Sequence, residues 1–282
     1  MNKNRKFILY CVTVLFISAT VSVSNLKAGQ SSSHLTYPPF PDEEKVISQI
    51  KKEESPSPLL LWQLSRLRLQ HAAELYKSWK QNKNAEAFQE ALIYAGSSTE
   101  LSPDWDEAWL LSGLLYSEMK ATPQAMEKAA DALVHAVDIN PANGRAQLLL
   151  AQVLMEQGRY WSAIEQFKML IQRNEAMRTP AVLSQLTFCY IADQRFQAGI
   201  DYVSKAPDIS GNDTTAKLRW QSWKLINQAI LMRAKGDEQA AGFLKVMFFY
   251  HDPSLTVIDE YQRYAKYLLK LWEKEGQNEK AN

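Results

Sequence analysis

Residues 144–167 read GRAQLLLAQVLMEQGRYWSAIEQF, and this stretch carries the clearest helical pattern of the chain. Apolar residues recur in it at three- and four-residue spacing on both sides of Gly158, which predicts two helices joined by a turn. The same spacing returns in residues 106–141 and continues along the chain from about residue 59. No sustained alternation of apolar and polar residues interrupts it. The sequence therefore predicts an all-α protein built from successive helix pairs.

Two adjacent segments place small and large residues at matching offsets. Residues 108–116 carry the pattern Ala-Trp-x-x-x-Gly-x-x-Tyr, and residues 146–167 repeat its spacing. These offsets resemble the tetratricopeptide repeat (TPR), a pair of antiparallel helices. In that family the small residues allow close helix approach, the large ones fill the gap, and a terminal proline ends the second helix. The repeat-defining residues implied by the resemblance are Trp109, Gly113, Tyr116, Ala129, Pro141, Gly158, Tyr160 and Ala163.

The resemblance covers about residues 60–253 and weakens toward both ends. A four-residue insertion is expected in the turn near Lys120–Gln124, and Glu175 stands where a terminal proline is usual. Residues 255–275 supply one more amphipathic helix, which would cover the open end of the stack. We therefore expect a TPR solenoid of about four helix pairs over residues 59–253, with a capping helix and tail over residues 254–282.

The N-terminal region has the composition of a targeting segment. Residues 7–24 contain no charge and follow three basic residues, which is typical of a secretion signal or a signal anchor. Residues 1–26 are therefore expected to be a signal peptide, cleaved after Ser24, or a retained transmembrane anchor. The positive-inside rule then places the rest of the chain on the periplasmic side of the inner membrane. Residues 27–58 are rich in proline and serine and predict a linker, with a possible short helix over 42–52.

The TPR resemblance also implies a binding surface. In TPRs a concave groove is lined by fixed positions of the first helix of each pair, and it holds an extended peptide or a helix. TPRs that clamp a carboxylate use Lys, Arg and Asn at these positions, whereas here they are mostly apolar. The alternative is that the N-terminal helix or the C-terminal cap covers them. The candidate groove residues are Leu110, Leu114, Leu148, Gln152, Met155, Phe188 and Ile191.

Composition argues against several function classes. The net charge is +1 and no long basic block follows the N-terminus, so no nucleic acid partner is expected. The four histidines are scattered, and no catalytic or phosphate-binding motif occurs, so we expect no enzyme activity, metal or cofactor. Cys189 is the one thiol beyond the apolar segment, and its aromatic neighbours indicate helix packing rather than a nucleophile.

Two functions remain compatible with the sequence. The first is a protein-protein interaction scaffold or adaptor, an accessory or assembly subunit of a larger envelope or respiratory complex. The second is a periplasmic chaperone, because the layout of residues 106–175 resembles the periplasmic TPR domains of cytochrome c maturation factors. Those domains hold the C-terminal helix of an apocytochrome. In both cases the partner is another protein, bound through the concave face, and the membrane is contacted through residues 7–24.

Overall fold

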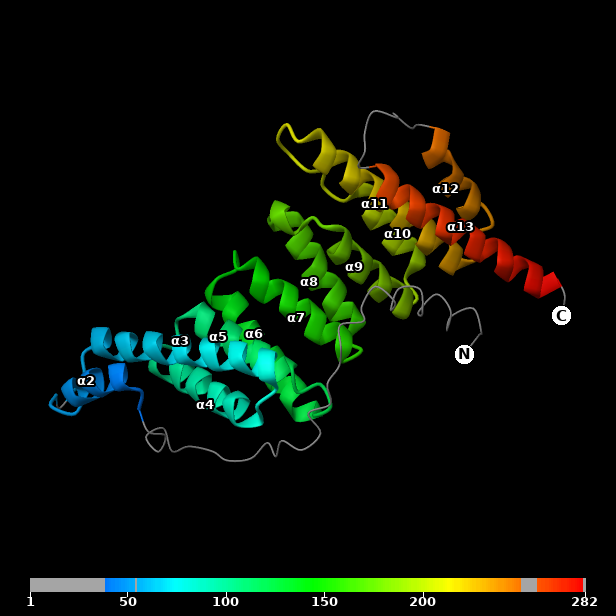
Figure 1. Ribbon diagram of the computed structural model, residues 1–282. Coiled ribbons are helices and arrows are strands. Elements are labelled where there is room, and N and C mark those ends of the chain that lie inside the picture. Colours follow the sequence, from blue (N-terminus) through cyan, green and yellow to red (C-terminus); the bar gives the residue numbers. More distant parts are fainter. Residues whose placement is uncertain (1–38, 54, 250–257, 281–282) are drawn as a thin grey trace. The chain divides into compact units, whose positions relative to one another are not determined.

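The computed structural model describes residues 39–53, 55–249 and 258–280, and within them it is helical with no strand (Figure 1). These residues fall into two compact units, a first unit of residues 39–157 and a second unit of residues 158–280. The division lies inside the region that the sequence predicts as one run of repeats. The helices of the first unit are α2 (Pro41–Ile50), α3 (Pro58–Asn82), α4 (Ala85–Leu101), α5 (Asp106–Ser117), α6 (Pro123–Ile139) and α7 (Gly144–Glu156). Those of the second unit are α8 (Tyr160–Arg173), α9 (Pro180–Ala192), α10 (Phe196–Lys205), α11 (Thr214–Lys235), α12 (Ala240–Phe249) and α13 (Ile258–Lys280).

Local chemistry sets the boundaries of the long α3. Its N-cap is Ser57, whose hydroxyl accepts a hydrogen bond from the Leu60 amide at 3.4 Å, and Pro58 fills the first helical position. The helix ends at Lys83, which adopts a left-handed conformation with φ 58°. Asn84 then caps α4 by accepting from the Glu86 amide at 2.9 Å. This two-residue connection makes α3 and α4 an antiparallel pair.

The first unit is a stack in which each helix packs on the next. The helices α3 and α4 form one pair, α5 and α6 form another, α4 packs on α5, and α6 packs on α7. The sequence predicted about four pairs, and the 25-residue α3, at the weaker N-terminal end of the repeat pattern, does pair with α4. Small side chains allow the helices to approach, and aromatic rings fill the remaining space. The core residues here include Ala72, Trp79, Phe88, Ala91, Ala95 and Leu115.

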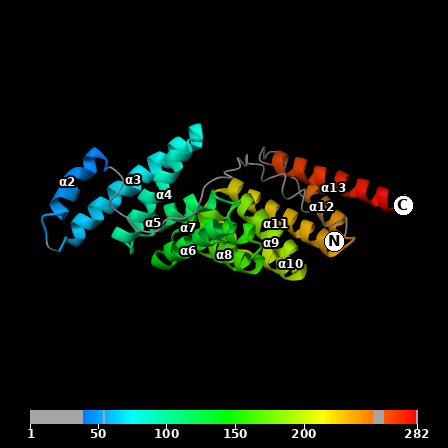
Figure 2. The ribbon, with the colours of Figure 1, turned by 90° about the horizontal axis from the view of Figure 1, so that it is seen from below.

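The region predicted as a linker contains a packed helix. Side chains at the start of α2 contact the middle of α3, and Figure 2 shows α2 beside α3. The Phe40 ring stacks on His71 with 3.7 Å between the centroids, and the buried Glu43 carboxylate lies 3.5 Å from Arg68 Nε. The prediction of a linker over residues 27–58 was therefore wrong for residues 41–50, although the short helix it allowed is present. The proline-rich composition indicated a linker because only a few residues, such as Phe40 and Glu43, attach α2 to α3.

The second unit continues the stacking with shorter helices. The helices α8 and α9 pack together, α10 packs on both α9 and α11, and α9 also contacts α11. Its core is formed by apolar side chains with almost no solvent exposure, among them Phe167, Leu170, Leu183, Leu186, Trp220 and Ile226. The predicted capping helix is present as α13, which packs against α11 and α12 (Figure 1).

The predicted signal or anchor over residues 1–26, including the apolar run 7–24, lies outside the described residues. Within the ranges that the structure describes, no helix combines the length and apolarity needed to cross a bilayer. His34 and His251, two of the four scattered histidines, are also outside them.

Candidate protein-binding surface

The candidate groove positions of the first unit lie on α5 and α7, two helices that contact each other. On α5, Leu110 is buried and Leu114 is half-buried. On α7, Leu148, Gln152 and Met155 are all half-buried. Leu114, Leu148 and Met155 therefore present apolar surface that the chain itself covers only in part. We call these three residues the α5–α7 strip.

In the second unit the matching positions of α9 differ in exposure. Phe188 is half-buried, and its ring meets Tyr160 edge-on with 5.9 Å between the centroids. Ile191, one turn later, is 8 % exposed and belongs to the core. The predicted set therefore mixes partly exposed positions with buried ones, because helix packing and groove formation use adjoining faces of the same helix.

The next helix of the series, α11, carries the matching positions Ile226, Ile230 and Arg233, which the sequence analysis did not assign. Ile226 has no solvent exposure and Ile230 is 9 % exposed. The face is occupied by α13, whose Tyr264 ring lies 5.4 Å from that of Trp223. On α11, the groove positions are therefore covered by the C-terminal helix, which is the alternative raised by the sequence analysis. The sequence signal for it was the apolar stripe of residues 258–272.

Most repeat-defining residues lie at helix contacts. A Cβ atom built on Gly113 would be 2.6 Å from Leu133 Cγ and 3.2 Å from the Ala129 carbonyl oxygen, so only glycine fits between α5 and α6. The Trp109 ring packs on His135 at 4.5 Å. Ala129 and Ala163 are fully buried, Tyr116 is half-buried, Tyr160 begins α8, Pro141 stands in the turn before α7, and Gly158 has φ +75° in the turn before α8.

The acidic group at the start of α5 connects neighbouring turns. The N-cap residue of α5 is Trp105, which makes no side-chain cap bond. Asp106 Oδ2 instead accepts hydrogen bonds from the side-chain amides of Asn140 at 2.8 Å and Asn143 at 2.9 Å. The carboxylate therefore fixes the α6–α7 turn against the start of α5, and it stays close to the helix N-terminus that favours negative charge.

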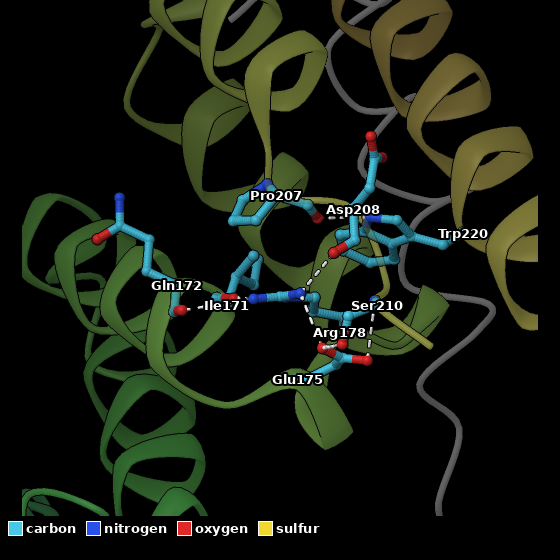
Figure 3. A network of polar contacts seen from close by, with 8 residues as sticks. All are labelled: Ile171, Gln172, Glu175, Arg178, Pro207, Asp208, Ser210 and Trp220. Atoms are coloured by element: carbon cyan, nitrogen blue, oxygen red, sulfur yellow. Dashed lines mark hydrogen bonds and ion pairs between the residues drawn. The ribbon is translucent and has the colours of Figure 1, made fainter. Parts of the chain in front are cut away.

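In the second unit, a network of polar contacts holds neighbouring turns together (Figure 3). Arg178 Nε donates to the Ile171 carbonyl at 2.9 Å, and its Nη1 donates to the Asp208 carbonyl at 2.6 Å. These bonds satisfy an open carbonyl at the end of α8 and tie it to the α10–α11 loop. Trp220 Nε1 holds the same loop by donating to the Pro207 carbonyl at 2.9 Å.

Glu175 completes this network from the loop between α8 and α9. Its Oε1 accepts from the Ser210 amide at 3.0 Å, and its Oε2 accepts from the Ser210 hydroxyl at 2.5 Å. The hydrogen bond from the Ser210 hydroxyl is the main cause that lowers the pKa of Glu175. Glu175 stands where the repeat pattern expects proline, so polar bonds rather than a rigid ring shape this turn.

Aromatic side chains lie exposed at two further places. In the first unit the rings of Trp62 and Trp105 are 6.1 Å apart, and Arg66 lies over Trp62 at 5.7 Å. In the second unit Arg195 stacks on Trp161 at 3.8 Å, with Trp161 49 % exposed. Trp220 and Trp223, by contrast, are buried packing residues.

Two observations concern metal-ligating and nucleophilic side chains of the described residues. No group of three or more His, Cys, Asp or Glu side chains in the described ranges is arranged to hold a metal ion. Cys189 is fully buried, and burial raises the pKa of its thiol to about 12. The neutral thiol is a poor nucleophile at physiological pH.

Comparisons with known proteins found two similarities. A sequence family described as "Tetratricopeptide repeat" matches residues 126–181, which cover α6, α7, α8 and the start of α9. One similar solved structure is "YrrB: a TPR protein with an unusual peptide-binding site", with 16 % identity and a TM-score of 0.48 over 82 % of this chain and 97 % of that one. No curated protein matches the sequence significantly.

The matched repeat and the stacked helix pairs around it support tetratricopeptide repeats in this chain, with residues 126–181 as the matched part. TPR folds serve as scaffolds for protein-protein interaction. The class of function is therefore protein binding.

Proposed function

We propose that this protein is a membrane-associated adaptor that binds an apolar or amphipathic helix of a partner protein through the α5–α7 strip. The observation that carries the proposal is the exposure of this strip. Leu114, Leu148 and Met155 are candidate groove positions on α5 and α7, the first helices of two successive repeats, and each is only half-buried. Apolar side chains repeated in this way suit the apolar face of a helix laid across them.

The absence of charged residues from the candidate groove positions favours an apolar ligand over a charged chain terminus. None of the candidate positions on α5 and α7 is Lys, Arg, Asp or Glu. A groove that held a carboxylate would need donors from Lys, Arg or Asn, since a buried unpaired charge is costly. The partner segment should therefore contact the strip through aliphatic or aromatic side chains.

The location belongs to the same proposal. Residues 7–24 are uncharged and follow Lys3, Arg5 and Lys6, which supports an N-terminal anchor with the repeats on the periplasmic side of the inner membrane. An adaptor held there would serve an envelope or respiratory complex.

A periplasmic chaperone is the second candidate, and one observation favours it. The turn between α5 and α6 spans residues 118–122, whereas the turn between α7 and α8 spans only residues 157–159. This long turn followed by a short one is the layout that resembles cytochrome c maturation factors. Such a protein would hold several unfolded clients rather than one fixed partner.

The test is a mild-detergent pull-down of the full-length protein from its native membrane, with mass spectrometry of bait and partners. Met155→Glu places a charge in the α5–α7 strip, and Val134→Glu is the control because Val134 is 43 % exposed and belongs to α6, which carries no strip residue. We expect one set of partners in fixed ratio with the wild type and the control, and at least about a tenfold loss with Met155→Glu. Thermal unfolding must show both variants folded.

Other results would change the conclusion. A bait that begins near Asn25 and captures a changing set of clients would replace the anchored adaptor with the chaperone. Equal capture by Met155→Glu and the wild type would exclude the α5–α7 strip as the binding surface.

A further inference from the structure

The face of α11 that corresponds to the groove positions is covered by a helix of the same chain. Trp223, Ile226, Ile230 and Arg233 follow one another at three- and four-residue spacing, so they share one face of α11. On α13, Tyr264, Leu268 and Trp272 are four residues apart and also share a face. Leu268 is 2 % exposed and Trp272 is 9 % exposed, so this face is the buried one.

Two ring contacts give the direction of α13 on this face. Tyr264 lies against Trp223, with 5.4 Å between the ring centroids. Trp272 lies under the Arg233 guanidinium, 6.0 Å from the ring centroid. Both contacts advance in the same direction along the two helices, so α13 runs parallel to α11. Leu268 stands between the two aromatic residues, as Ile226 and Ile230 stand between Trp223 and Arg233.

We propose that α13 is an internal ligand of the repeat surface, and that it competes with a partner helix for the α11 face. The partner it fits is an amphipathic helix with aromatic residues eight positions apart and an aliphatic residue midway between them. This inference rests on the function proposed above and adds a second binding surface, which is closed in the chain by itself.

The chemistry of the contact allows exchange between the two helices. The contact with α11 joins apolar and aromatic side chains and one cation–π pair, and a partner helix with the same pattern can make all of these. α13 also packs against α12, so its release gives up that contact as well. The opposite side of α13 faces solvent, with Tyr267 54 % exposed and Lys270 also exposed. On α9, which packs against α11, half-buried Phe188 offers a longer ligand further apolar surface.

The fraction of molecules in which α13 has left the α11 face determines how much weaker a partner binds there. If α13 leaves its site in about 1–10 % of molecules, the apparent affinity of a partner for the α11 face falls about 10- to 100-fold. A substitution that releases α13 removes this penalty. Tighter binding after the loss of a buried contact is a result that a purely structural cap would not give.

The experiment measures binding of a labelled peptide spanning residues 258–280 to the full-length chain by fluorescence anisotropy. The wild type and Leu268→Asp are compared, with Tyr267→Asp as the matched control on the exposed side of α13. We expect Leu268→Asp to bind the peptide at least about tenfold more tightly than the wild type and the control do. The same peptide carrying Leu268→Asp should not bind any of them. A folded Leu268→Asp chain that binds no better than the wild type overturns the proposal.

Hydrogen exchange of the unmodified chain tests the proposal even if Leu268→Asp fails to fold. Amides of residues 264–272 should exchange at least about tenfold faster than those of residues 223–233, because α13 opens while α11 stays folded. Equal protection of both segments makes α13 an integral part of the unit and overturns the proposal. Neither measurement depends on the α5–α7 strip, so loss of the function proposed above would show separately in the Met155→Glu pull-down.

Discussion

At the scale of single residues, two glycines set how closely the helices of a pair approach. A Cβ atom on Gly113 would lie 2.6 Å from Leu133 Cγ. One on Gly199, at the start of α10, would lie 2.9 Å from Tyr190 Cγ and 3.0 Å from Leu231 Cδ2. Real Cβ atoms do not approach other atoms so closely, so any larger residue must move a buried neighbour. A helical glycine normally lowers stability, and its presence here is explained by packing.

Gly113→Ala should therefore destabilise the protein by about 1–3 kcal/mol, the usual cost of overpacking a core. Gly96→Ala is the matched control, because Gly96 lies within α4 and has no atom within 4 Å of its Cβ position. The control should gain up to about 1 kcal/mol from helix propensity alone. Chemical denaturation of both variants checks this. A Gly113→Ala chain as stable as the control would mean that the helix pair opens at no cost.

At the scale of elements, α2 is attached by charged groups that the chain buries. Glu43 has no solvent exposure and Arg68 is 8 % exposed. Burial raises the pKa of Glu43, although Arg68 and His71 act in the opposite direction and Asp42 adds to the increase. A carboxyl group whose pKa is raised by folding stabilises the folded state most when it is protonated. Its contribution is complete below its ordinary value of 4.5 and is lost as the pH rises through the raised value.

Glu43→Gln imitates the protonated form and should remove this pH dependence. We expect the variant to have a higher Tm than the wild type at pH 8, and the difference to shrink toward zero at pH 4. Glu44→Gln is the control, because Glu44 is the exposed neighbour on the same helix. Thermal unfolding at several pH values provides the measurement. A lower Tm for Glu43→Gln at pH 8 would show that pairing with Arg68 outweighs the cost of burying the charge.

At the scale of the whole molecule, stability should be distributed along the chain. In both units helices pack mainly on their neighbours in sequence, as α3 does on α4 and α5 on α6. In such a stack the free energy of unfolding is close to a sum of repeat and nearest-neighbour contributions. Damage at one helix pair is then expected to remain local.

Two substitutions test this distribution by hydrogen exchange. Gly113→Ala should speed amide exchange in α5 and α6 of the first unit and change α10 and α11 little. Gly199→Ala should do the reverse, because its clash lies with Tyr190 and Leu231 in the second unit. A uniform increase along the chain with either variant would show that the protein unfolds as one cooperative body.

The helix pairs, the resemblance to TPRs and the glycine at the α5–α6 contact could all be read from the sequence alone. Helix periodicity, caps and turns arise from residues a few positions apart, so their signals can be read locally. It also pointed to the α5–α7 strip, since repeat offsets carry each position to the next helix. The exposure of that strip could not be read in this way.

The solvent exposure of the candidate groove positions depends on the tertiary structure, which leaves some of them partly exposed and covers others. Ile191 belongs to the core, and α13 closes the α11 face through contacts between residues about forty positions apart, such as Trp223 and Tyr264. The docking of α2 likewise depends on Arg68, some 25 positions beyond Glu43. Contacts over such separations leave no periodic pattern in the sequence. An apolar helix face has the same sequence pattern whether another helix of its own chain or a partner protein covers it.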